Sequence, residues 1–161
     1  MAGAIFLTGA CAGRVPPPER APSTEASGCR GALSPEDEAR ALESMTIVGA
    51  GARFHESGCN GECRVIGVQL VVRPPQGVTL ERFARVVRCH SLRVRDGEVD
   101  ASRIPNDPYG QPDTSLGIDV GVADGNFLVT LVGDTFADTL RIQQSAKAYA
   151  GTHGVAWRWG N

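Results

Sequence analysis

The nine residues from 55 to 63, "HESGCNGEC", concentrate the side chains best suited to chemistry. They hold one of the three histidines and two of the five cysteines in the chain. His55, Cys59 and Cys63 recur at every fourth position, and imidazole and thiolate groups are ligands for zinc and copper. Cysteines also form disulfides in an oxidising compartment or react as free thiols. The stretch is therefore a metal site, a disulfide-stapled loop or a reactive thiol pair.

A metal site here needs a fourth ligand, for which Cys89 and His90 are the candidates. Strong zinc motifs contain two C-x2-C pairs, whereas this stretch holds a single C-x3-C. Adjacent helical residues point about 100° apart, which argues against Cys89 and His90 binding one ion. The pattern favours a stapled loop without a cofactor. The alternative is a zinc or copper site made of His55, Cys59, Cys63 and His90.

Residues 1–12, "MAGAIFLTGACA", are short, small and apolar, and Leu7-Thr8-Gly9-Ala10 leads into Cys11. This segment resembles the end of a bacterial lipoprotein signal peptide, in which an invariant cysteine is lipidated. The resemblance implies lipid on Cys11 and a membrane anchor at the periplasmic face of the cell envelope. No Lys or Arg precedes the apolar run, so we expect the true start upstream. Ala10-Cys11-Ala12 alternatively fits an A-x-A site for ordinary secretion.

Residues 13–32 are rich in Pro, Ser, Ala and Gly without an apolar period, which predicts a tether. Residues 33–161 are then a single domain. The chain is 42% apolar and 21% charged with a net charge of −2, which is ordinary for a globular protein. No basic stripe occurs, so the composition does not indicate a nucleic-acid partner.

The cysteines left when Cys11 carries lipid are Cys29, Cys59, Cys63 and Cys89. An even number in an exported chain predicts two disulfides, and sequence spacing does not choose the pairing. Cys59 or Cys63 bonded to Cys89 and a local Cys59–Cys63 bridge are all feasible. Cys29 is placed to pin the tether to the body. A helical projection puts Cys89 off the apolar stripe, beside arginines.

The elements that position these residues alternate between helices and strands. Ser34-Pro35 followed by three acidic residues marks the start of a helix. Asp124-Gly125 between alternating apolar runs marks a hairpin. We expect Asp134 to cap the last helix, whose apolar side is formed by Phe136, Leu140, Ile142, Ala146 and Tyr149. The pattern predicts helices over 34–43, 79–91 and 135–150, strands over 44–54 and 64–74 and on both sides of the Asp124-Gly125 turn, and a short final strand.

From residue 64 the predicted order is β-α-β-β-α with a final strand. This order is typical of a ferredoxin-like (split β-α-β) sandwich of the α+β class. We therefore expect an antiparallel sheet with two helices on one face, plus an extra N-terminal helix and an edge strand over 45–54.

The favoured function is a non-catalytic binding or interaction module, exported to the envelope, which takes a protein partner or small ligand through its sheet or the 103–114 loop. The alternative is a metal-binding or thiol-redox protein that uses the loop of His55, Cys59 and Cys63. A third hypothesis is a hydrolase with Asp107, Asp113 and His90, although nothing in the sequence brings these together. A lone histidine on a helix flank is more typical of a hydrogen-bonded packing residue.

Overall fold

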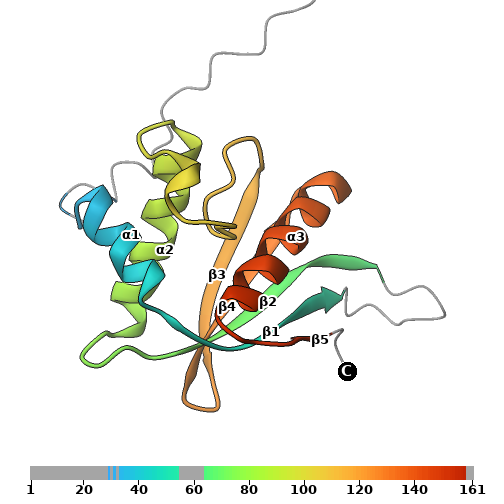
Figure 1. Ribbon diagram of the computed structural model, residues 1–161, viewed down its shortest axis with the longest axis horizontal. Helices are drawn as coiled ribbons and strands as arrows, with labels where there is room; N and C mark the ends of the chain where they lie inside the picture. The colour runs from blue at the N-terminus through green and yellow to red at the C-terminus, as the bar shows by residue number, and fades with distance from the viewer. Residues whose placement is uncertain (1–28, 30, 32, 55–63, 159–161) are drawn as a thin grey trace, which may run out of the picture.

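The structure is a computed structural model that describes residues 29, 31, 33–54 and 64–158. Helices pack on one face of a five-stranded sheet (Figure 1). The predicted α+β class is confirmed. The elements are α1 (Pro35–Glu43), β1 (Thr46–Phe54), β2 (Val65–Arg73), α2 (Leu80–Arg95), the short 3-10 helix η2 (Ala101–Arg103), β3 (Leu116–Ala123), β4 (Asn126–Gly133), α3 (Phe136–Thr152) and β5 (Trp157–Arg158).

The sheet has the strand order β3-β4-β2-β1-β5. All neighbours are antiparallel except β1 and β5, which pair in parallel at Ala50 and Gly51. The prediction of a purely antiparallel sheet is therefore wrong, and β1 is not an edge strand where β5 pairs with it. A ferredoxin-like sheet would place the final strand beside β2. Here β1 holds that position because it pairs with β2 along nearly its whole length.

The hairpin between β3 and β4 forms where the sequence predicts it. Asp124 and Gly125 both have positive φ, at 50° and 74°. This geometry matches the right-handed twist of the flanking strands, and it favours Asp and Gly. The hairpin places β4 between β3 and β2, while α2 connects β2 to β3.

The core lies between the sheet and the helices. Val68, Leu70 and Val72 alternate along β2 and are fully buried, as a strand with one covered face requires. Phe83 of α2 stacks on Phe127 of β4 with ring centroids 4.8 Å apart. The other core residues include Leu42 of α1, Val87 of α2, Val129 and Leu131 of β4, and Ile142, Ala146 and Tyr149 of α3.

The apolar side of α3 agrees with the prediction at three residues and differs from it at two. Phe136 and Leu140 are 56% and 41% exposed. Ile142, Ala146 and Tyr149 are buried as predicted, and with Thr139 they form a stripe whose spacing matches 3.6 residues per turn. Helix α3 begins after Thr135, which forms a capping box with Asp138, so Asp134 is not the cap.

Candidate functional site

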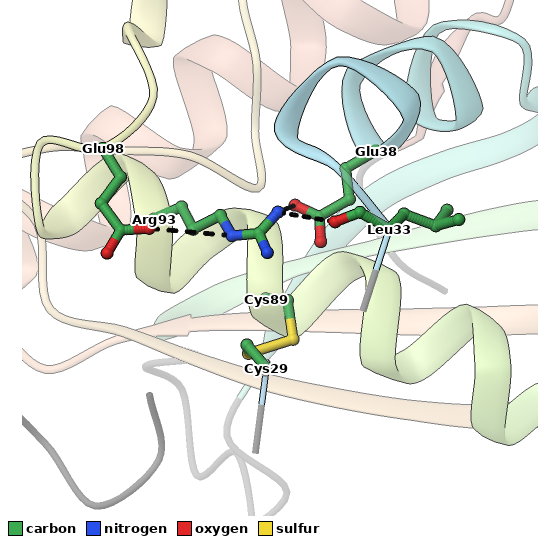
Figure 2. The surroundings of a disulfide bond; sticks show 6 residues. All are labelled: Cys29, Leu33, Glu38, Cys89, Arg93 and Glu98. Atoms are coloured by element: carbon green, nitrogen blue, oxygen red, sulfur yellow. Dashed lines mark hydrogen bonds and ion pairs between the residues drawn. A yellow bond between two sulfur atoms is a disulfide. The ribbon is translucent and has the colours of Figure 1, made fainter. Parts of the chain in front are cut away.

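The disulfide joins Cys29, at the end of the predicted tether, to Cys89 in the middle of α2 (Figure 2). Cys29 therefore pins this part of the chain to the body, and neither Cys59 nor Cys63 is the partner of Cys89. Cys89 is 2% exposed. Cys89 lies outside the main core cluster, and it is buried beside the cysteine bonded to it.

A buried ion pair beside the disulfide connects α1 to α2 (Figure 2). Nη1 of Arg93 lies 2.8 Å from Oε2 of Glu38 and also donates to the Leu33 carbonyl at 2.9 Å. The Glu38 side chain is fully buried. Burial raises the pKa of the Glu38 carboxyl, and the electrostatic influence of the nearby Arg93 and His90 side chains opposes that rise. Arg93 thus holds a carboxylate that burial alone would disfavour.

His90 forms a second buried polar pair, on the adjacent turn of α2. Its Nε2 lies 2.6 Å from Oδ2 of Asp107, and the side chains are 1% and 2% exposed. The backbone N–H of Tyr109 donates to Oδ1 of the same carboxylate at 2.9 Å. The prediction of His90 as a hydrogen-bonded packing residue is confirmed. The pair attaches the loop that follows η2 to the core.

The Nε2 of His90 is engaged with Asp107, and His90 stays a predicted fourth ligand of the alternative metal site. His55, Cys59 and Cys63 lie outside the described residues, so their role stays a prediction, as does lipid on Cys11. Within the part of the chain that the structure describes, no group of three or more His, Cys, Asp or Glu side chains is placed to hold a metal ion.

The structure brings together two of the three residues of the hydrolase hypothesis, but it buries that pair away from any substrate. His90 and Asp107 meet, although sequence reasoning did not place them together. Asp113 is exposed on the loop before β3, where its carbonyl accepts a hydrogen bond from Arg141. A general base must reach its substrate. The His90–Asp107 pair is closed off from solvent, so its geometry fits a structural role.

A groove runs between α2 and β3, which lie side by side in Figure 1. It consists of two hollows of about 580 and 340 Å³ that share Arg88 and Leu92. The first is lined by Cys29, Leu80, Glu81, Ala84, Arg85 and Val120 besides these two, and the second by Ser91, Arg95, Thr114, Leu116, Gly117 and Ile118. We call this surface the α2–β3 groove.

The helix wall of the groove follows directly from the sequence. Glu81, Arg85, Arg88, Leu92 and Arg95 are spaced by four, three, four and three residues, so they form one stripe of α2. Sequence reasoning did not single out this stripe, although its spacing and its three arginines were visible. Strand β3 contributes the apolar side chains of Leu116, Ile118 and Val120, and the helix wall carries more positive than negative charge.

The chain matches no protein-family model, no curated protein and no solved structure. Its class is therefore defined by its own geometry, an α+β sandwich with a mixed sheet and a disulfide that joins the chain at Cys29 to a core helix. Within the described residues, no helix has the length and hydropathy needed to cross a bilayer.

Proposed function

We propose that the chain is an exported domain of the cell envelope that acts as a non-catalytic binding module, held at the membrane through a lipid on Cys11. The single observation that carries the proposal is the Cys29–Cys89 disulfide. Disulfides persist in the periplasm and outside cells and are rare where glutathione and thioredoxin reduce thiols. The bond also joins the body to the segment expected to lead to the anchor.

Binding is favoured over catalysis because of where the polar groups lie. The His90–Asp107 and Glu38–Arg93 pairs are inside the protein and connect elements of the fold. The α2–β3 groove, by contrast, is open at the surface and offers apolar side chains of β3 with charged side chains of α2. We further propose that the part from β2 to α3 is related to the ferredoxin-like fold. In this proposal β1 is an added strand between β2 and the final strand.

The test is production of the full chain in a bacterial host that is fed a labelled fatty acid. Envelope and soluble fractions are separated, and free thiols are alkylated before lysis. We expect label on the wild-type chain, no label on Cys11→Ser, and alkylation of Cys29 and Cys89 only after reduction. If the chain is exported but carries no label, it is secreted without a lipid anchor, and that part of the proposal is wrong. Alkylation of Cys29 and Cys89 without reduction, together with no label, would overturn the proposal.

A further inference from the structure

The edge of the sheet beside the α2–β3 groove is open. Among the described strands, β3 pairs with β4 alone, so one side of Leu116–Ala123 has no strand partner. In an antiparallel strand, alternate residues direct their N–H and C=O groups to that free side. An edge of this kind is a template for an added strand. Eight residues is long enough to pair with an extended peptide of similar length.

The α2 side of the groove, next to this edge, carries arginines whose positive charge would favour an acidic ligand. Arg88 lines both hollows and is exposed, and its side chain makes no hydrogen bond or ion pair with a described residue. Leu92 lies beside it and, with Val120 and Ile118 of β3, provides apolar contact area. Arg85 and Arg95 add positive charge on either side of Arg88 and Leu92, and Glu81 ends the stripe.

We propose that the α2–β3 groove binds an extended acidic segment of another protein, which joins the free edge of β3 as an added strand. This inference rests on the proposed binding function and gives it a site and a partner class. In an added strand the side chains alternate between the two faces of the sheet. Those on the helix side meet the arginines of α2 and the apolar side chains of β3. Backbone pairing supplies affinity, and the side chains give specificity.

On the face of the sheet away from α2, the side chains of the added strand would meet a negative charge. Asp119 lies on the exposed face of β3, away from α2. An acidic side chain of the peptide on that face would lie next to this carboxylate and be disfavoured. The groove therefore selects acidic residues at alternate positions rather than acidic composition alone. Carboxylates on the helix side form charge-assisted contacts with guanidinium groups, which are stronger than neutral hydrogen bonds.

The test uses the purified, oxidised full chain and a fluorescein-labelled acetylated octapeptide. The probe has glutamate at its second, fourth and sixth positions and threonine or valine elsewhere. An isomer with the three glutamates in a row is the composition control. Two further versions of the alternating peptide are N-methylated at every second amide. One lacks the hydrogen-bond donors along one edge of the extended peptide, and the other lacks those along the opposite edge.

We expect saturable binding of the alternating peptide by fluorescence anisotropy, and weaker binding of the isomer. One N-methylated version should lose binding while the other retains it, because only one edge of the peptide pairs with β3. Amide exchange along Leu116–Ala123 should slow when the peptide is bound.

The variant Arg88→Glu should weaken binding about tenfold or more. Arg82→Glu is the matched control, since Arg82 is an exposed arginine of α2 that lies outside the groove. It should bind within about twofold of wild type. Far-ultraviolet circular dichroism and melting temperature verify that both variants fold.

The proposal would be overturned by no saturable binding, by equal loss in Arg82→Glu and Arg88→Glu, or by equal binding of both isomers. A concentration-dependent dimer that Arg88→Glu disrupts would assign the groove to a second copy and equally overturn it. Failure of the peptide to bind would not alter the fatty-acid labelling or the thiol alkylation that test the proposed function. The two failures are therefore distinguishable.

Discussion

Nε2 of His90 and Oδ2 of Asp107 lie 2.6 Å apart inside the core, although the two residues are 17 positions apart in the chain. The second carboxylate oxygen of Asp107 accepts the backbone N–H of Tyr109. Both oxygens of a buried carboxylate thus have partners, as burial of such a group requires. This arrangement holds the connection between α2 and β3 against the helix.

Gly110 is the position on which this contact depends. A Cβ added there would lie 2.5 Å from Oδ2 of Asp107, 2.8 Å from Cγ2 of Val94 and 3.1 Å from Nε2 of His90. We expect Gly110→Ala to destabilise the protein by about 2 kcal/mol, measured by urea unfolding, because overpacking displaces the pair. Gly121→Ala is the control, since its Cβ meets nothing within 4 Å. Equal losses in the two variants would contradict the explanation.

Two ion pairs with the same N–O distance of 2.8 Å should differ in their effect on stability. Arg93–Glu38 is buried, whereas the Arg40 and Asp37 side chains are 74% and 50% exposed. Arg93→Gln leaves a buried carboxylate without its cation and should cost about 3 kcal/mol. Arg40→Gln should change the free energy of unfolding by less than about 1 kcal/mol. Similar values for both would show that burial does not control the difference.

Stability should fall at alkaline pH because of two buried tyrosines. Burial raises the pKa of the Tyr109 hydroxyl well above its usual 10.0, and it also raises the pKa of Tyr149. Above about pH 10 the unfolded chain releases these protons while the folded chain keeps them. The free energy of unfolding therefore decreases as pH rises, by up to about 1.4 kcal/mol per pH unit for each tyrosine.

Tyr109→Phe isolates one of these contributions. The Tyr109 hydroxyl is buried and has no hydrogen-bond partner among the described residues. Its removal should leave stability at pH 7 within about 1 kcal/mol of wild type or raise it, since an unsatisfied polar group is lost. Denaturation curves at pH 7 and at steps up to pH 11 test this. An alkaline slope as steep as that of wild type would count against the assignment.

The disulfide closes a loop with a sequence separation of 60 residues. Its loss should destabilise the body by about 4 kcal/mol through the entropy of the unfolded chain. Cys29→Ala tests this by urea unfolding, because it leaves Cys89 as a buried thiol, which behaves as a small apolar residue. Peptide mapping after alkylation verifies that Cys89 has not bonded elsewhere. A loss below about 1 kcal/mol would mean that native contacts alone hold Cys29 in place.

Local features of the fold were predictable from the sequence. The helix that begins after Ser34 and the hairpin at Asp124 and Gly125 follow from capping and from residues that tolerate positive φ. The place of β5 was not predictable. Only two residues pair, and whether they lie beside β1 or β2 depends on tertiary packing.

Contacts between side chains far apart in the sequence were harder to predict than the helices and strands. Asp107 is in a proline-rich connection without periodicity, so no pattern directs it to His90. Cys29 was expected to pin the tether, but its partner was not determined, because spacing does not fix disulfide connectivity. In α3, hydrophobicity correctly suggested Ile142, Ala146 and Tyr149 as core residues. It also suggested Phe136 and Leu140, which the packing against the sheet leaves exposed.

The disulfide also determines how mechanical force enters the molecule. A pull on the chain ahead of Cys29 passes through the sulfur–sulfur bond to Cys89 and into the middle of α2. The segment between the two cysteines, including α1, β1 and β2, lies in a covalent loop that this load bypasses. Tension between Cys29 and the C-terminus can therefore extend the part after Cys89 while the bonded loop stays closed.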